Sequence, residues 1–280
     1  MENSQFGSAT NRNSATAPAR YSRVKEPAVH VKSHRGAPRG FFQCEAAGLR
    51  WLKEAEPAGG ARVVDVVSIG RTELTLNRIV KSEATARKAE KFGAALAITH
   101  DAGAAAWGSP PDGWDGPGFF GPLDDPHPMS LKPRTTFGEY WANDRLRPAL
   151  AQLRSEYTTR ELATFDRLLE RLHDGDFDTD DSPARVHGDL WWGNVMWDEE
   201  GAILIDPAAH GGHREEDLAL LGLFGMPHLD RIYAAYEEVH PLPGREERAP
   251  LHRLYAVLMH AILFRGKYAE QAYDIAKKYA

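Results

Sequence analysis

The chain has 280 residues, enough for one large domain or two small ones, and 42% of them are hydrophobic, which is ample for a buried core. Its net charge of −6 and isoelectric point near 6.1 argue against a nucleic-acid partner or a polybasic membrane role. The one cysteine, Cys44, excludes an intrachain disulfide and favours a reducing, cytoplasmic setting. No apolar run is long enough to span a bilayer, and the first residues lack the apolar core of a secretory signal.

The first eighty residues predict a small β-rich lobe. Residues 1–20 are rich in Ser, Asn, Thr and Ala, and we expect them to be flexible. Alternating and apolar patterns predict three strands and one helix: strands at 28–32, 63–69 and 73–80, and a helix at 41–53. The second and third strands read as a hairpin that turns near Gly70.

The chain after residue 80 is mostly helical in pattern. A helix follows Ser82, a plausible N-cap, and reaches His100. Residues 101–133 are rich in Gly, Pro, Asp and aromatic side chains and predict a long irregular loop. Further helices are predicted at 136–155, 158–174, 214–225, 229–240 and 250–279. We therefore predict an α+β chain with an N-terminal lobe at 1–80 and a C-terminal lobe at 81–280.

The segment 187–206 carries most of the functional signal. Two short apolar runs within it flank a Gly-containing turn and predict a β-hairpin, so Asn194 and Asp206 should meet at its base. An amide oxygen beside a carboxylate suits Mg²⁺, which binds few protein oxygens plus phosphates. Asp189, just upstream, lies where a carboxylate can take a proton from an attacking hydroxyl. Together these residues indicate phosphoryl transfer. Taken singly, Asp189 could cap a turn, and Asn194 and Asp206 could simply hydrogen-bond.

The motif around Asp189 resembles the fructosamine (ketosamine) kinase family, a branch of the protein-kinase-like fold that also includes the aminoglycoside and choline kinases. The spacing HGD-L-x-x-x-N fits that whole group, and DPAxxxGHRExDLA looks specific to the ketosamine kinases. The resemblance covers residues 28–270 and is carried by FFQCEAAGLRWL, DGWDGPGFFGPL, VHGDLWWGNVMW and ILIDPAAHGGHREEDLALLGLFG. It implies a bilobal fold: a small β-rich N-lobe with one main helix, and a larger, mostly helical C-lobe.

The resemblance gives roles to the residues around the hairpin. It implies that Asp189 is the catalytic base or orients the acceptor hydroxyl, and that Asn194 and Asp206 are the Mg²⁺ ligands. His187 and Asp217 would support the catalytic loop without reacting. A plain helix-capping role remains an alternative for Asp217.

A second group of residues is expected to bind ATP. Glu45 shares the apolar face of its helix, where an unpaired carboxylate is costly, and Lys32 at the end of the preceding strand is its natural partner. In the kinase fold such a pair places the ammonium on the nucleotide phosphates. The alternative is a snorkelling lysine beside a half-exposed glutamate. By resemblance, Asn77 and Ile79 lie where a hinge binds adenine, mainly through backbone groups.

Four residues are candidates to contact the substrate. Trp191 and Trp192 could form an apolar wall beside it, although packing against the core is the alternative for one of them. In the family a small residue usually follows the first tryptophan, so Trp192 is a departure. His213 and Arg214 could contact substrate or phosphate, or form a salt-bridged helix start. The stretch 107–120 could fold over the same pocket.

We predict an ATP-dependent, Mg²⁺-requiring kinase that phosphorylates a sugar hydroxyl of a ketosamine, either a small molecule or a glycated protein, with a role in deglycation. We expect a monomer or weak dimer. One alternative is a related kinase that acts on an aminoglycoside or choline. The other is a nucleotide-binding pseudokinase, because the kinase fold covers the phosphates with a Gly-rich turn and the only glycine before residue 36 is Gly7. A cover built from residues 6–21 would be atypical.

Overall fold

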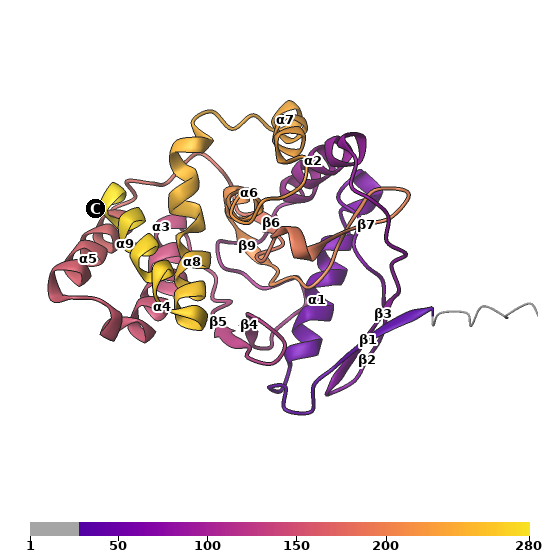
Figure 1. Ribbon diagram of the computed structural model, residues 1–280, viewed down its shortest axis with the longest axis horizontal. Coiled ribbons are helices and arrows are strands. Elements are labelled where there is room, and N and C mark those ends of the chain that lie inside the picture. The colour runs from indigo at the N-terminus through magenta and orange to yellow at the C-terminus, as the bar shows by residue number, and fades with distance from the viewer. Residues whose placement is uncertain (1–27) are drawn as a thin grey trace, which may run out of the picture.

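The computed structural model describes residues 28–280, in which a small sheet adjoins a larger helical part (Figure 1). The expectations for residues 1–20 and for a phosphate cover at 6–21 lie outside the described residues. Within the described range, no helix combines the length and the apolar character that crossing a bilayer requires.

An antiparallel sheet begins the described chain, with its strands in the order β1-β3-β2. The strands are β1 (Val29–Ser33), β2 (Val66–Ile69) and β3 (Glu73–Asn77). Helix α1 (Phe41–Lys53) has the predicted bounds and packs on this sheet, with its apolar residues Phe42, Leu49 and Leu52 buried. The strand predicted at 63–69 starts late, because the backbone N–H of Val64 donates to Leu204 O at 3.1 Å. That contact ties the sheet region to a hairpin much later in the chain.

The predicted hairpin near residue 200 is confirmed. It consists of β7 (Val195–Trp197) and β8 (Ala202–Leu204), which pair antiparallel. A second antiparallel pair, β6 (Ala184–Val186) with β9 (His210–Gly212), was not predicted, since strands of three residues leave little pattern. The segment 187–194 therefore connects β6, which pairs with β9, to β7, which pairs with β8.

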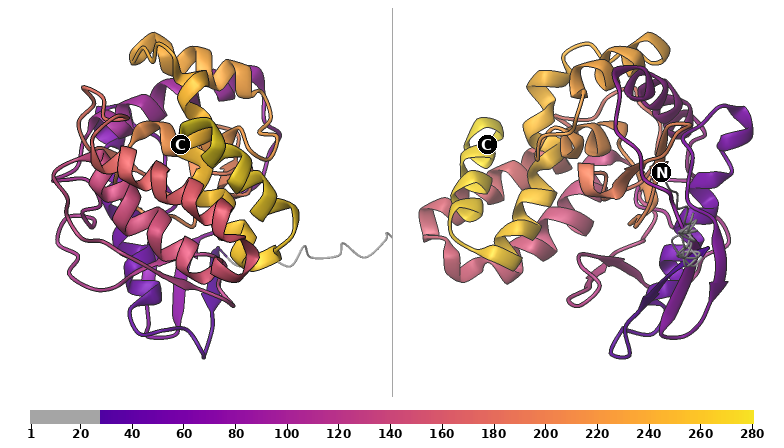
Figure 2. Two further views of the ribbon diagram at one scale, coloured as in Figure 1. Left: turned by 90° about the vertical axis from the view of Figure 1, so that its left-hand side faces the viewer. Right: turned by 45° about the vertical axis from the view of Figure 1, so that its right-hand side comes forward.

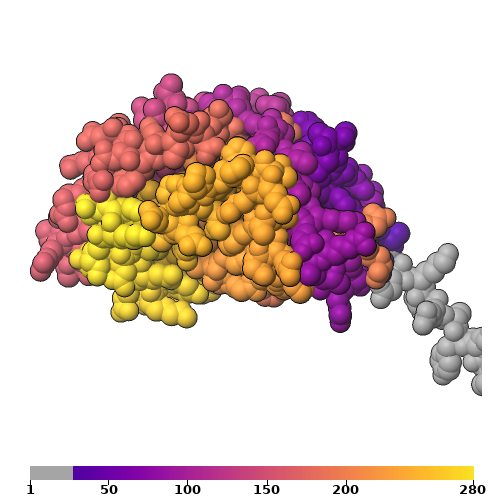
Figure 3. Space-filling model, turned by 90° about the horizontal axis from the view of Figure 1, so that it is seen from above, coloured from indigo at the N-terminus to yellow at the C-terminus, as the bar shows by residue number. Residues whose placement is uncertain are grey.

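Helices make up most of the remaining chain. They are α2 (Ala86–Asp101), α3 (Phe137–Tyr140), α4 (Arg147–Gln152), α5 (Thr159–His173), α6 (Arg214–Leu221), α7 (Leu229–Val239), α8 (Arg245–Phe264) and α9 (Lys267–Tyr279). Helix α9 packs against both α5 and α8 (Figure 2). Helices α2 and α7, far apart in sequence, pack together, and their surfaces adjoin when the molecule is seen from above (Figure 3).

Two helix predictions were wrong in their interiors. The region 136–155 is divided into α3, a π-helical turn at Trp141–Leu146, and α4. The region 250–279 forms two helices, because Arg265 and Gly266 take φ values of 56° and 59°, which a right-handed helix does not allow.

Two further predictions are corrected near the middle of the chain. The N-cap of α2 is Thr85, not Ser82, and its side chain accepts a backbone hydrogen bond at 3.3 Å. The irregular loop predicted at 101–133 contains a short hairpin, β4 (Gly118–Phe120) with β5 (His127–Met129). The Gly- and Pro-rich composition concealed these short strands.

Buried apolar side chains form two clusters. The first joins the N-terminal sheet and α1 to α2, β7, β8 and α7, and the second joins α3, α4 and α5 to α8 and α9. Leu74 and Phe92 belong to the same cluster, so the clusters do not divide the chain at residue 80, and a lobe boundary there stays a prediction. The β4–β5 hairpin contributes Phe119 to the first cluster and Phe120 to the second. It therefore lies where the clusters meet.

Candidate active site

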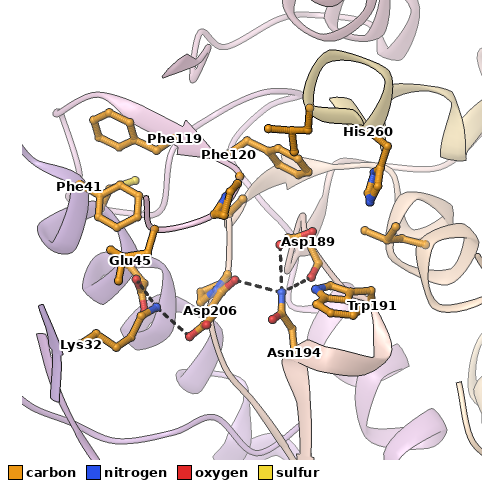
Figure 4. A pocket seen from close by; sticks show the side chains of 18 of the residues that line it. Lys32, Phe41, Glu45, Phe119, Phe120, Asp189, Trp191, Asn194, Asp206 and His260 are labelled. Atoms are coloured by element: carbon orange, nitrogen blue, oxygen red, sulfur yellow. Dashed lines mark hydrogen bonds and ion pairs between the residues drawn. The ribbon is translucent and has the colours of Figure 1, made fainter. Parts of the chain in front are cut away.

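A cavity of about 1010 Å³ opens beside the β4–β5 hairpin (Figure 4). Its walls also come from β1, α1, the predicted catalytic loop (residues 187–194), the residues after β8 and the C-terminal part of α8. The predicted site residues that line it are Lys32, Glu45, Asp189, Trp191, Trp192, Asn194 and Asp206. The fold thus brings together predicted site residues that are far apart in the sequence, such as Lys32 and Asp206, which are 174 positions apart.

The loop that carries Asp189 is anchored by the buried carboxylate of Asp217. The backbone N–H groups of His187 and Gly188 donate to its two oxygens at 2.7 and 2.9 Å, and His100 Nε2 lies 3.1 Å away. Burial opposes the charge of Asp217, but the contacts with His100 and His187 hold its pKa below the ordinary value. These are the contacts expected of a residue that supports the loop.

His187 and Gly188 fix the shape of the loop. The His187 ring donates from Nε2 to Ile205 O at 2.8 Å and accepts from Asp189 N at Nδ1 at 3.2 Å, so both ring nitrogens are engaged. Burial lowers the pKa of His187, which keeps the ring neutral. Gly188 has a φ of 79°, and a Cβ there would lie 2.3 Å from Ala208 O, so only glycine fits.

The carboxyl group of Asp189 faces the cavity and contacts Asn194. Asn194 Nδ2 donates to the backbone oxygen of Asp189 at 2.8 Å and to its Oδ2 at 3.0 Å. Burial raises the pKa of Asp189 to about 7, and the nearby Asp206 and Asp217 act in the same direction. A carboxylate with a raised pKa accepts a proton more readily than an ordinary one.

Lys32 lies between two carboxylates on the other side of the cavity. Its Nζ is 2.7 Å from Glu45 Oε1 and 3.0 Å from Asp206 Oδ1, so the predicted pair is formed and gains a third member. The side chain of Lys32 is 13% exposed and that of Glu45 only 7%, which explains why neither could be left unpaired. Burial opposes the charge on Lys32, but the two carboxylates raise its pKa, and the ammonium is retained.

Asn194 and Asp206 meet at the base of the hairpin, where the Ile205 N–H donates to Asn194 O at 3.1 Å. Because Asn194 Nδ2 is used by Asp189, its Oδ1 is left as an acceptor. The Asp206 side chain is 39% exposed to the cavity side and has a second oxygen beyond the one that contacts Lys32. An amide oxygen and a carboxylate oxygen are hard ligands, and this donor set fits Mg²⁺.

Comparison with known proteins identifies the family. The family model described as fructosamine kinase matches residues 11–280. This chain belongs to that family. A probable ketoamine kinase of Vibrio vulnificus is 32% identical to it over 238 residues, which cover 82% of this chain and 77% of the relative. The crystal structure of a fructosamine-3-kinase candidate from Thermobifida fusca is 39% identical with a TM-score of 0.79, covering 90% of this chain and 85% of that one.

This member of the family also shares its fold with more distant phosphotransferases. The structure of the gentamicin–APH(2″)-IIa complex has a TM-score of 0.58 at 14% identity and covers 90% of this chain and 87% of that one. At this identity the likeness concerns the fold alone. It confirms the predicted α+β, protein-kinase-like architecture.

Asn77 and Ile79 do not line the cavity that holds Asp189. They line a separate hollow beside β3, together with Lys53, Arg62 and Asp198 among others. Asn77 Nδ2 donates to Asp65 Oδ2 at 3.0 Å, so the side chain is engaged within the sheet region. Their assignment to ATP binding stays a prediction.

His213 and Arg214 also lie away from the cavity. His213 is 1% exposed, caps α6 by accepting from Glu215 N, and stacks on Trp107 at 5.9 Å. Arg214 Nη1 lies 2.7 Å from Asp101 Oδ1, and its Nε lies 3.1 Å from Asp181 Oδ1. These contacts are those of the alternative, a salt-bridged helix start. Of the stretch 107–120, Phe119 and Phe120 reach the cavity, while Trp107 is buried elsewhere.

The fold adds aromatic residues that the sequence analysis did not assign to the site. These are Phe224 after α6, His260 and Phe264 in α8, and Tyr268 in α9, all of which line the cavity. His260 and Phe264 are four residues apart, a helical spacing that indicates a shared face but does not say what the face contacts. No local signal in the sequence connects them to Asp189.

Proposed function

We propose that this member of the fructosamine kinase family uses Mg·ATP to phosphorylate a sugar hydroxyl of a ketosamine. The carrying observation is the cavity in which Asp189 and Asn194 lie opposite the Lys32–Glu45 pair, with Asp206 between them. The names of its relatives, a ketoamine kinase and a fructosamine-3-kinase, support this substrate class.

Each polar residue has one task in the proposed reaction. The Lys32 ammonium, oriented by Glu45, binds phosphate oxygens of ATP. Asn194 Oδ1 and Asp206 would hold Mg²⁺, which when bound neutralises phosphate charge. The substrate hydroxyl, held near Asp189, attacks the γ-phosphorus; the bond to the β–γ bridging oxygen breaks, ADP leaves, and Asp189 takes the hydroxyl proton.

The geometry of the site also fits catalysis by positioning. The two anchors of the loop, Asp217 and His187, are buried and already hydrogen-bonded within the protein, so they hold Asp189 in place and do not face the cavity. Positioning and charge neutralisation account for most of the acceleration in phosphoryl transfer. We further propose a deglycation role, in which the phosphorylated ketosamine breaks down and releases its amine.

The test is a Mg·ATP assay with ribulosamine and fructosamine substrates, in which the phosphorylated position is mapped on the product. We expect Asp189→Asn to lower kcat by about 10²–10⁴-fold, because the general base is lost, while ATP affinity is retained. The exposed Asp230→Asn serves as the matched control and should retain activity. An active Asp189→Asn enzyme would exclude Asp189 as the base.

A substrate panel that includes an aminoglycoside and choline, read by ADP release, separates the alternatives. Turnover of those compounds but not of any ketosamine would support the related-kinase alternative. Normal ATP binding without turnover of any acceptor would support the pseudokinase.

A further inference from the structure

A continuous row of aromatic rings leads away from Asp189 along one wall of the cavity. Trp191 and Trp192 of the catalytic loop lie 5.3 Å apart between ring centroids, and Trp191 lies 6.1 Å from Phe224. Phe224 continues to His260 at 4.9 Å. In Figure 4, Trp191 and His260 lie on the side of Asp189 opposite the Lys32–Glu45 pair. We call the six residues of this wall the aromatic subsite: Trp191, Trp192, Phe224, His260, Phe264 and Tyr268.

Two rings of the aromatic subsite are exposed at the cavity. Trp192 is 48% exposed and Phe264 is 65% exposed. Among the described residues, these are the only aromatic side chains in the set of exposed large hydrophobic ones, and both line the cavity that contains Asp189. Single exposed apolar residues are common on proteins, but two exposed rings beside one reaction centre indicate a surface that a ligand covers.

The aromatic subsite carries no net charge. The carboxylates that line the cavity within the described range are Asp189, Glu45 and Asp206, and the last two are paired with Lys32. His260 Nδ1 donates to Ala256 O at 2.7 Å, which fixes the proton on that nitrogen and leaves Nε2 as an acceptor. Burial lowers the pKa of His260 and keeps the ring neutral.

This environment distinguishes between classes of amine. Among the residues that line the subsite, a polycationic amine would find no further carboxylate, and an anionic substituent would find no cation. Lys267, whose Nζ lies 5.3 Å from the centroid of the Tyr268 ring, does not line the cavity. The secondary ammonium of a ketosamine is attracted by the faces of aromatic rings, and an apolar group attached to it can cover exposed rings.

We propose that the aromatic subsite binds the amine portion of the ketosamine, and that Trp192 and Phe264 select substrates whose amine bears an apolar substituent of about the size of a phenyl ring. The proposal rests on the proposed function, since Asp189 must face the sugar for the amine to reach these rings. It concerns the substituent on the nitrogen, not the sugar.

The experiment compares two ketosamines with the same sugar, the fructosamines of benzylamine and of methylamine. We expect kcat/KM to be at least about 10-fold higher for the benzyl compound in the wild-type enzyme, since burial of an apolar ring is favourable. In Trp192→Ala and Phe264→Ala the ratio of kcat/KM for the benzyl compound to kcat/KM for the methyl compound should fall by about 5-fold or more. Trp192→Phe, which keeps an aromatic ring, should retain most of the wild-type ratio. Val239→Ala, which removes an exposed apolar side chain outside the cavity, should leave the ratio unchanged.

Binding of both fructosamines is also measured by calorimetry without turnover. Equal affinities and equal kcat/KM values for the benzyl and methyl compounds would overturn the subsite, as would an unchanged ratio in both alanine variants. Preferential binding of the benzyl compound without phosphorylation of either one would support the subsite and count against the proposed function. Thermal unfolding of each variant shows whether it is folded.

Discussion

At the scale of single residues, the partners of each buried charged group determine what that residue can do. Lys32 keeps its ammonium in a buried position because Glu45 and Asp206 flank it. Asp217 keeps its charge because backbone N–H groups of the catalytic loop donate to it. Asp189 has only the amide of Asn194, and its pKa is accordingly raised to about 7. Of the two loop carboxylates, Asp189, the residue proposed as the base, therefore has the less stabilised charge.

Replacing Lys32 with methionine should impair the use of ATP. The variant keeps the apolar stem but leaves Glu45 buried without its cation and removes the charge proposed to bind phosphate. We expect kcat/KM for ATP to fall by about 10²–10³-fold, in line with the loss of one electrostatic contact to the transition state. Lys91→Met, at an exposed position of α2 that lines neither the cavity nor the hollow beside β3, is the control and should change this value less than about 2-fold. Equal ATP kinetics in the two variants would contradict a phosphate-binding role for Lys32.

At the scale of elements, a close approach of two helix backbones and an ion pair between two connecting segments hold neighbouring elements together. Helices α2 and α7 meet at Gly93, where a Cβ would lie 2.1 Å from Ile232 O. Arg62, in the segment before β2, joins that segment to Asp198 in the β7–β8 turn. Its Nη1 and Nη2 donate to the two carboxylate oxygens of Asp198 at 2.7 and 2.8 Å. Both contacts connect parts of the chain that a sequence pattern treats as separate.

Gly93→Ala should weaken the contact between α2 and α7. Because the obstructing atom is a backbone carbonyl oxygen, the helices must move apart, and we expect the free energy of unfolding to fall by about 1–3 kcal/mol. Urea unfolding checks this, with the exposed Lys91→Ala on the same helix as the control, expected to lie within about 0.5 kcal/mol of wild type. A Gly93→Ala protein as stable as wild type would show that the two helices need not approach so closely.

The Arg62–Asp198 contact should make stability depend on pH. Hydrogen bonds from Arg62 lower the pKa of Asp198 from 3.8 to about 2, so its contribution is complete above pH 4 and is lost as the pH falls towards 2. We expect Asp198→Asn to lower the free energy of unfolding by about 1–2 kcal/mol at pH 7, and the difference from wild type to shrink between pH 4 and pH 2. The neighbouring exposed Glu199→Gln is the control. A difference that stays constant over this range would refute the pairing as its origin.

At the scale of the whole molecule, the cavity lies where the two hydrophobic clusters meet. Glu45 comes from α1, which contributes to the first cluster, while His260 and Phe264 come from α8, which contributes to the second. A ligand that fills the cavity therefore contacts both. Binding to the folded state alone raises stability by mass action.

Mg·ATP should for this reason raise the melting temperature. At a concentration of 100 times Kd, binding contributes about 2.7 kcal/mol, which for a chain of this size corresponds to a rise of about 5 °C. The measurement is a thermal melt with ATP in the presence and absence of Mg²⁺. Asp206→Asn, which loses the proposed carboxylate ligand, should show a smaller rise with Mg·ATP. Identical melting temperatures with and without Mg·ATP would contradict nucleotide binding in this cavity.

The amino-acid sequence by itself determined the parts of this protein that depend on local pattern. The bounds of α1, the β7–β8 hairpin, and the pairing of Lys32 with Glu45 follow from periodicity, turn composition and the cost of an unpaired carboxylate on an apolar helix face. The motif around Asp189 was sufficient to indicate the kinase group, and the block DPAxxxGHRExDLA that follows it was needed to indicate the family.

Only the tertiary structure decided the rest. Strands of three residues, such as β6 and β9, have no periodicity to detect and exist because their partner lies elsewhere in the chain. His213 is buried and caps the start of α6. Nothing in the neighbouring sequence distinguishes this structural position from one that faces a substrate. Phe224 and His260 become part of one wall because α8 returns to the catalytic loop, a contact between residues far apart in sequence that no local pattern encodes.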